Sequence, residues 1–401
     1  MKNLVGAFVL SFFVYSIGSA QDIQGPRFGK GILNISGKDS TWSMNFTTRF
    51  QLLGSATWQE DEVGNTDFNS DFLVRRARLK FSGFAFTKKL TYKIEIGLSN
   101  RDISGGSIYT NNTDRFIHDA YIQWNFYKNL SIRAGQAKLP GNIERLISSG
   151  SLQFVDRSLL NSEFNINRDI GLQLLNEHNL TPTFLIRERF AFSQGDGRNV
   201  TVGNMGGYQY TGRLELLPLG AFKNDNEMEG SALERETKPK LMVSVAYDYN
   251  DDSVKTQGNG GDFMEIDDGE LYKTDISTLF ADVVFKYKGI SLMAEYANRD
   301  ADDPVAVDSQ NIPTGDIVKS GSAFNIQGGY LFDSNWEVSG RFTNLDFDQV
   351  VQSEMEEKQY TLGVSKYIVD HHLKLQTDIS YATFANQGDT IMARLQLELQ
   401  F

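Results

Sequence analysis

Short segments in which apolar and polar residues alternate recur along almost the whole 401-residue chain. In the segment 90–98, Leu90 and Tyr92 share one parity with other apolar residues, whereas Thr91 and Lys93 share the other parity. Successive side chains of a β-strand point to opposite faces of the sheet, so this pattern predicts strands with one apolar and one polar face. Segments of about ten alternating residues, separated by turn signals, are typical of an antiparallel β-barrel in an outer membrane.

The number of such segments predicts an all-β fold, a transmembrane antiparallel β-barrel of about sixteen strands. After Gln21 the chain has no run of 18 apolar residues, so no transmembrane helix is expected. A closed sheet satisfies every backbone donor and acceptor within lipid. A soluble β-sandwich is the alternative, but it does not need this many strands with aromatic-flanked apolar faces. We expect strands at 43–57, 71–86, 89–99, 118–127, 130–137, 168–176, 182–193, 207–217, 240–250, 276–287, 289–298, 321–332, 335–346, 357–367, 371–383 and 389–401.

The connections between these segments alternate between short and long, as expected when short periplasmic turns lie opposite long external loops. The connection at 218–239 does not fit, because it should be a short turn and has 22 residues. The register or topology of the chain is therefore open at that point.

The first 20 residues have the composition of a cleaved signal peptide. Lys2 precedes an apolar stretch from Leu4 to Ile17, and Gly18-Ser19-Ala20 provides a small-residue cleavage site. We therefore expect a signal peptide at 1–20, a periplasmic N-terminal extension at 21–42 and the transmembrane β-barrel at 43–401. The expected location is the outer membrane of a Gram-negative bacterium, in contact with its lipid.

The charges of this acidic chain are distributed unevenly. The formal net charge is −12, and acids gather in the long connections, for example at 59–71. Bases occupy the polar parity of the early strands, and Arg75 breaks the apolar row beside them. In a barrel the polar parity faces the lumen, and basic rings are how pores select anions. The expected anion path comprises Arg49, Arg75, Arg76, Arg78, Lys80, Lys93, Arg133 and Lys138. A general porin with a lumen of mixed charge is the alternative.

The third long connection, 138–167, is too apolar for a solvated loop. Ile143, Leu146 and Ile147 would share one helical face that must be buried, and the barrel interior is the nearest place. Folded inward, this long third loop would narrow the lumen and offer Arg145, Arg157 and Arg168. The alternative is a loop that caps the barrel or packs on a neighbouring subunit.

Other chemistry finds little support in the sequence. On a regular strand His118 and Asp119 would point to opposite faces, and His371-His372 falls in an expected short turn. Asp248, Asn250 and Asp252 begin like a calcium loop, but Ser253 and Asn259 stand where its Gly and Glu should be. We expect no catalytic residues, no metal, no cofactor and no nucleic-acid partner. The alternatives are an enzyme barrel and a non-conducting accessory or adhesion barrel.

The block 135–171 resembles a motif of the phosphate-selective porin O and P family. The residues that carry the resemblance are Gly135, Gln136, Lys138, Pro140, Gly141, Glu144, Ser148, Ser149, Phe154, Asp156, Arg157, Ser158, Arg168 and Gly171. The resemblance implies a sixteen-stranded homotrimeric porin whose third loop enters the lumen and whose basic ladder leads inorganic anions to a constriction. Phosphate and polyphosphate become candidate solutes on this resemblance alone. The terminal Phe401 is similar to the assembly signal of outer-membrane proteins.

Overall fold

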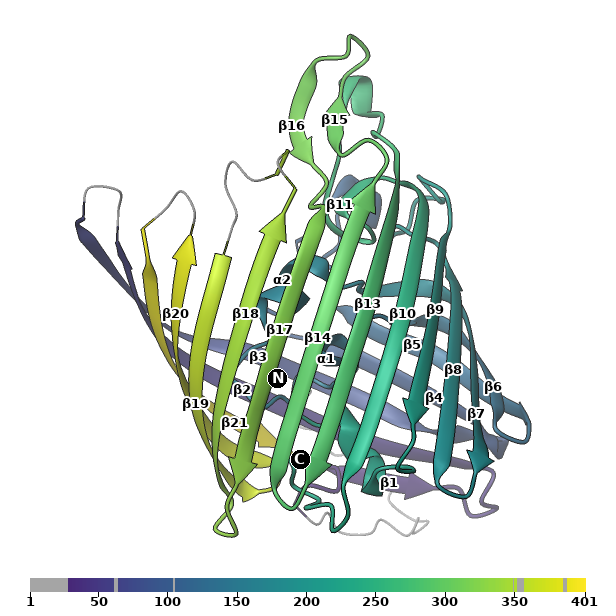
Figure 1. The fold of residues 1–401 in the computed structure, drawn as a ribbon. Coiled ribbons are helices and arrows are strands. Elements are labelled where there is room, and N and C mark those ends of the chain that lie inside the picture. The colour runs from purple at the N-terminus through teal and green to yellow at the C-terminus, as the bar shows by residue number, and fades with distance from the viewer. Residues whose placement is uncertain (1–27, 61–63, 104, 349, 352–356, 385–387) are drawn as a thin grey trace, which may run out of the picture.

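Sixteen antiparallel strands close into one barrel in the computed structural model, which describes residues 28–60, 64–103, 105–348, 350–351, 357–384 and 388–401 (Figure 1). Each strand pairs with the next, and the last pairs with the first, β21 with β2. The prediction of a sixteen-stranded barrel is confirmed. The strands of the barrel are β2 Trp42–Glu60, β3 Thr66–Ala85, β4 Thr87–Gly97, β5 Ile117–Tyr127, β6 Leu130–Lys138, β7 Arg168–Thr181, β8 Phe184–Ser193, β9 Gln209–Leu217, β10 Lys240–Ser253, β13 Thr274–Tyr287, β14 Ile290–Ala301, β17 Gly321–Leu331, β18 Trp336–Phe347, β19 Glu357–Val369, β20 Leu373–Phe384 and β21 Thr390–Gln400.

The outward parity of the strands is apolar and exposed. Trp124, Leu172, Tyr247, Leu292 and Ile379 are each at least 39 % exposed. A barrel in lipid needs an apolar outer band of this kind, because lipid replaces water as the solvent of that face. Among the described residues no helix has both the length and the apolar character to cross a membrane.

A short additional strand, β1 (Leu33–Ser36), lengthens the sheet where the chain enters the barrel. It pairs with Ser43–Phe46 of β2, on the edge that β21 occupies farther along. The backbone N–H of Phe401 donates to the carbonyl of Thr48, so β1 continues the row that β21 ends. The described part of the expected extension 21–42 is therefore paired with the barrel, and the expected signal peptide 1–20 lies outside the described residues.

Two β-bulges change the faces that the alternation predicts. The first bulge lies in β3. Gln51 of β2 pairs with Arg76 of β3, but the next residue of β2, Leu52, pairs with Val74, so Arg75 is an extra residue in β3. Strict alternation would place Val74 on the same face as Arg76 and Arg78, but Val74 is 45 % exposed and lies on the outward face. The bulge reverses the alternation, and Arg75 joins Arg76 on the inner face.

The second bulge lies in β5. Glu95 pairs with Asp119 and Ile96 with Ile117, which leaves His118 as the extra residue. His118 and Asp119 are both buried, each 3 % exposed. The expectation that they point to opposite faces is therefore wrong, because the bulge interrupts the alternation on which it was based.

The misfitting connection 218–239 folds against the inner face of the barrel. It contains the 3₁₀ helix η2 (Lys223–Met228), and Asn226, Glu227 and Ser231 are fully buried. The buried Lys286 Nζ of β13 donates to the carbonyls of Asn226 (2.5 Å), Glu229 (2.7 Å) and Ser231 (2.7 Å). The length of this connection is thus explained by its anchoring, and the strand order continues regularly on either side of it.

We call this end of the barrel, where β2 begins and the short connections lie, the turn end. We call the opposite end the loop end.

Several long connections at the loop end carry their own secondary structure. They contain η1 (Ile108–Thr110) and η3 (Asp267–Gly269), and two hairpins formed by β11 (Lys255–Gln257) with β12 (Gly260–Phe263) and by β15 (Val305–Val307) with β16 (Pro313–Ile317). The β15–β16 hairpin rises above the rim of the barrel (Figure 1).

The third connection contains two short helices, α1 (Ile143–Leu146) and α2 (Leu159–Phe164). Ile143 and Ile147 are buried in a cluster with Leu217, Met242 and other apolar residues of the strands. Leu160 and Phe164 belong to a second cluster that includes residues of β13, β14 and β18. Ile143 and Ile147, two of the three apolar residues that the sequence singled out, are therefore buried against the strands, and Leu146 is partly buried against the same cluster.

Candidate functional site

A cavity of about 740 Å³ lies between the inner faces of β3–β8 and the third connection. Its lining runs from loop-end residues such as Asp102 and Arg198 to turn-end residues such as Asp225 and Met228, so it extends along the barrel. Thirteen basic side chains line it: Arg75, Arg76, Arg78, Lys93, Arg101, Arg133, Lys138, Arg145, Arg157, Arg168, Arg187, Arg189 and Arg198. Six acidic side chains line it: Glu95, Asp102, Asp119, Glu177, Asp225 and Glu227. The cavity therefore has an excess of positive charge although the chain as a whole is acidic.

Cations on the other side of the barrel bind the third connection instead of lining the cavity. Lys374 Nζ donates to the carbonyl of Gly150 (2.9 Å), and Arg213 Nη1 donates to that of Gly141 (2.6 Å). Arg341 Nη1 donates to the carbonyl of Asp156 (2.9 Å). Lys374, Arg213 and Arg341 are buried, so their charges hold the third connection in place. The wall formed by the early strands, in contrast, keeps its cations beside open space.

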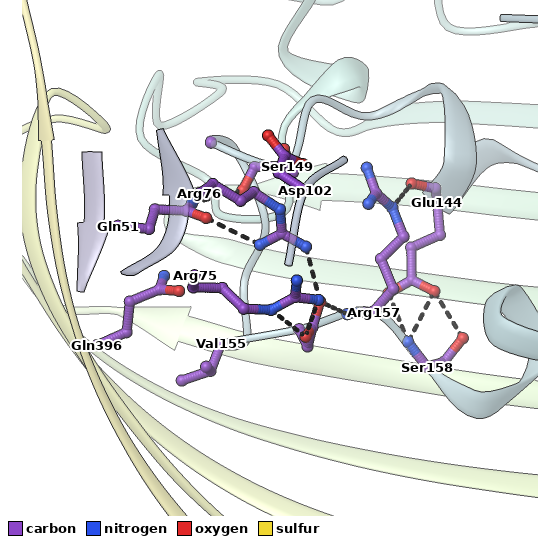
Figure 2. A network of polar contacts seen from close by, with 12 residues as sticks. Gln51, Arg75, Arg76, Asp102, Glu144, Ser149, Val155, Arg157, Ser158 and Gln396 are labelled. Carbon is purple, nitrogen blue, oxygen red and sulfur yellow. Dashed lines mark hydrogen bonds and ion pairs between the residues drawn. The ribbon is translucent and has the colours of Figure 1, made fainter. Parts of the chain in front are cut away.

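Seven of the cavity cations are held by carboxylates: Arg75, Arg76, Arg78, Lys93, Arg168, Arg187 and Arg189. Arg75 donates twice to Asp156 Oδ2 (2.7 and 3.1 Å), and Arg76 Nη2 donates to Asp156 Oδ1 (3.0 Å). Figure 2 shows Arg75 and Arg76 lying side by side near Arg157. Burial raises the pKa of Asp156, whereas the two guanidiniums lower it. The guanidiniums outweigh burial and hold the pKa of Asp156 well below the usual range of an aspartate.

Three of the other paired cations, Arg78, Lys93 and Arg168, lie nearer the loop end. Arg78 donates to both oxygens of Asp102 (2.5 Å each) and to Glu95 (2.6 Å). The Arg78 guanidinium also holds the pKa of Asp102 well below its usual range. Lys93 pairs with Glu95 and Asp119, and Arg168 pairs with Asp119 (2.6 Å). On β8, Arg187 pairs with Glu227, and Arg189 pairs with Glu215 (3.4 Å). In each case a carboxylate offsets much of the positive charge.

Four cavity cations, Arg133, Lys138, Arg145 and Arg157, have only neutral partners within the described part of the chain. We call them the uncompensated cations. Lys138 Nζ donates to the carbonyls of Leu146 (2.9 Å) and Ile147 (3.1 Å). Arg157 donates to the carbonyls of Glu144 (2.9 Å) and Ile147 (2.7 Å).

Arg133 and Arg145 are held by side-chain amides. Arg133 donates to Gln123 Oε1 (2.8 Å) and Gln173 Oε1 (3.2 Å), and its guanidinium lies 4.5 Å from the centre of the Tyr121 ring. Arg145 donates to the side-chain oxygen of Asn167, and its buried Nε has no hydrogen-bond partner among the described residues.

The uncompensated cations of the third connection repel one another and their neighbours. Burial and the nearby Arg157 and Arg168 lower the pKa of Arg145 well below its usual value. Burial and the nearby Arg76 lower the pKa of Arg157 to about 9. Both directions mean that the local environment disfavours the charged form, and a negative charge in the cavity would relieve this.

The structure brings nine of the eleven expected site residues to the cavity, and the exceptions are Arg49 and Lys80. Arg49 is buried beneath the third connection, where its Nη2 donates to Ser149 Oγ (2.7 Å). Lys80 lines a separate hollow near the turn end together with Lys30 and Asn45.

Four basic residues of the lining were not among the expected site residues. Arg187 and Arg189 lie on the polar parity of β8, and that signal was present in the sequence. Arg101 and Arg198 come from long connections, where no periodicity indicates direction. Arg198 Nη1 lies 2.6 Å from His118 Nδ1, a contact that depends on the bulge in β5.

The residues weighed for other chemistry are engaged in structural contacts. Asp248 accepts hydrogen bonds from Gln209 (2.8 Å) and Thr211 (2.6 Å), which lie on the neighbouring strand. His371 is buried, with its Nδ1 at 3.4 Å from Lys374 Nζ. Within the described residues no group of three or more His, Asp or Glu side chains is arranged to hold a metal ion.

Several solved structures are similar to this chain over most of its length. Salmonella typhi OmpF, in a complex with daunomycin, is 12 % identical with a TM-score of 0.56, over 92 % of this chain and 100 % of that one. Pseudomonas putida OprB at high pH is 12 % identical with a TM-score of 0.53, over 89 % and 94 %. The channel DcaP of Acinetobacter baumannii is 13 % identical with a TM-score of 0.51, over 91 % and 99 %. At these identities the likeness shows the fold alone.

No curated protein matches the chain. The family described as phosphate-selective porin O and P matches residues 46–401, nearly the whole barrel and its connections. The chain therefore belongs to the phosphate-selective porin O and P family.

Proposed function

We propose that this outer-membrane porin passes small anions by diffusion along the basic wall formed by β3–β8, with the third connection as its constriction. The observation that carries the proposal is the group of uncompensated cations, Arg133, Lys138, Arg145 and Arg157, which line one cavity. The paired cations beside them would add a weaker positive field, because carboxylates offset their charge.

The energetics favour passage over tight binding. A hydrogen bond from a charged donor to an anion is worth about 1.5–3 kcal/mol. The lumen is wet, and salt screens exposed charges over about 8 Å at physiological strength, so the lower part of that range applies. Conduction requires sites that are favourable enough to enter and weak enough to leave. A row of partly compensated cations around a few uncompensated ones meets both requirements.

Phosphate is a candidate solute within this proposal. The planar fork of arginine suits the oxygens of phosphate, and three of the four uncompensated cations are arginines. The six carboxylates of the cavity act in the opposite direction, because they repel a doubly charged anion more than a singly charged one. These acids are also the observation that favours a general porin as the second candidate function.

Single-channel recording in a lipid bilayer tests the proposal. With a gradient of potassium chloride across the bilayer, the reversal potential should have the sign of chloride preference. A potential near zero would support the general porin instead. The absence of conductance from correctly folded protein would favour an accessory or adhesion barrel.

A further inference from the structure

Three large apolar side chains line the same cavity as the uncompensated cations. They are Leu146 of α1, Leu175 of β7 and Met228 of η2, and we call them the apolar ledge. Leu146 and Met228 pack on the buried cluster that contains Ile143 and Ile147. Each of the three is only partly buried, so part of its hydrocarbon surface faces the cavity.

Leu146 and Leu175 each lie next to a cation, and Met228 follows an acid that is paired with one. The carbonyl of Leu146 accepts the hydrogen bond from Lys138 Nζ (2.9 Å), and Arg145 precedes Leu146 in the chain. Leu175 pairs across the sheet with Arg189. Met228 follows Glu227, which forms an ion pair with Arg187. Hydrocarbon and positive charge therefore alternate over a short distance around one cavity.

Aromatic surface contributes to the same cavity. Tyr121 lines it, and the guanidinium of Arg133 lies 4.5 Å from the centre of the Tyr121 ring. Gln173, which accepts from Arg133 Nη1, is two residues from Leu175 on β7. An uncompensated cation, an aromatic ring and a residue of the apolar ledge therefore lie on neighbouring positions of β5, β6 and β7.

A hydrated inorganic anion gains nothing from this hydrocarbon surface, since its water shell separates it from Leu146 or Met228. An anion with a hydrocarbon body would displace water from the ledge while its charged group met the cations. Each methylene group removed from water is worth about a fourfold change in affinity. The cavity, at about 740 Å³, is within the size range of small-molecule sites.

We propose that this constriction favours organic anions, a carboxylate carried on a compact hydrocarbon or aromatic body, over inorganic anions. The proposal rests on the anion pathway proposed above and names its substrate class. The carboxylate would approach the uncompensated cations, and the body would lie against the apolar ledge.

Block of the chloride current tests the proposal, with benzoate, acetate and inorganic phosphate as probes. Benzoate should halve the single-channel current at a concentration about five times lower than acetate, since the two share one carboxylate and differ in the body. Met228→Ser should raise the benzoate concentration needed by about three- to tenfold and leave the acetate concentration within about twofold. Met228→Leu, which keeps the hydrocarbon, should behave like the wild type.

Leu219→Ser is the matched control, because Leu219 lies in the same connection, is 45 % exposed and does not line the cavity. It should leave the block by all three probes unchanged. Leu146→Ser provides an independent second test on a different element, in case Met228→Ser fails to fold.

The outcomes separate this inference from the proposed function. If the wild type prefers chloride over potassium but benzoate blocks no better than acetate, the inference is wrong and the anion pathway stands. If Met228→Ser and Leu146→Ser leave the block by benzoate unchanged, the ledge is not in the path and the inference is also wrong. A wild-type channel that prefers potassium contradicts the proposed function itself.

Discussion

Arg75 and Arg76 are consecutive in the chain, yet both donate to the carboxylate of Asp156. A regular strand would place them on opposite faces. The bulge at Arg75 turns both guanidiniums inward, and Asp156 of the third connection meets them there. One carboxylate thus ties the third connection to the basic wall and offsets part of its charge.

Asp156→Asn should raise the anion preference of the channel and loosen the third connection. Two guanidiniums lose their charged partner, and the pair is only partly exposed, so the loss of stability should be about 1–2 kcal/mol. The measurement is the reversal potential in a salt gradient, together with the noise of the open-channel current. Glu60→Gln, an exposed acid at the end of β2, is the control and should change neither. A variant that matched the wild type in both respects would show that Asp156 does not hold the third connection.

The pH dependence of the contact between Asp156 and the two arginines follows from the direction in which the pKa of Asp156 is shifted. The pKa of Asp156 is lower in the folded protein than in an unfolded chain, so its contribution to stability is present above about pH 4 and is lost as pH falls further. The difference in current noise between the wild type and Asp156→Asn should therefore stay constant from about pH 7 to about pH 5. A difference that vanished in that range would contradict the low pKa of Asp156.

Lys286→Ala should destabilise the barrel through the connection 218–239. The buried ammonium of Lys286 donates hydrogen bonds to three carbonyls of that connection. Without the ammonium these carbonyls are buried acceptors that lack a donor, and each costs about 1–3 kcal/mol of stability. Thermal unfolding followed by circular dichroism in detergent should show a lower midpoint. Lys288→Ala changes an exposed lysine two residues away and should leave the midpoint unchanged. Equal midpoints for the two variants would mean that this connection is not anchored by Lys286.

Deletion of residues 143–160 should raise the conductance while the barrel still assembles. The deleted residues contact Arg76 on the basic wall and Lys374 and Arg341 on the opposite wall. Lys374 and Arg341 would then face water in place of backbone carbonyls. Single-channel conductance measures the effect, and β-type circular dichroism checks the fold. An unchanged conductance would place the third connection outside the path of the ions.

The protein should form a stable homotrimer in detergent. We expect an unboiled sample to migrate on a gel as an oligomer. Boiling should convert this oligomer to an unfolded monomer that migrates at the mass of one chain. Light scattering of the purified protein would give the number of subunits. A monomer of constant size in every detergent tested would contradict the expected trimer.

The barrel could be predicted from the sequence because alternation is a local property of each strand. All sixteen expected segments correspond to strands of the structure. The bulges at Arg75 and His118 could not be predicted, because a single extra residue does not change the composition of a segment. The alternation continues on both sides of the bulge, with opposite parity.

The candidate site could be predicted only in part, for a related reason. The polar parity indicated which cations face inward, and most of them line the cavity. The compensation of Arg75, Arg76 and Arg78 depends on Asp156 and Asp102, two acids of long connections that lie 24 to 81 residues from these partners in the chain. The inward course of 218–239 depends on Lys286, which is 60 residues from Asn226 in the chain. No local pattern contains these pairings.

The central claim is that the uncompensated cations set the preference for anions. The most direct measurement is the reversal potential in a potassium chloride gradient, for the wild type, Arg133→Gln, Arg145→Gln and the control Lys88→Gln. Lys88 is an exposed cation at the turn end and does not line the cavity. We expect a chloride-preferring wild type, a clearly reduced preference in Arg133→Gln and Arg145→Gln, and no change in Lys88→Gln. A wild type that prefers potassium, or an equal potential in all four proteins at low salt, would contradict the account.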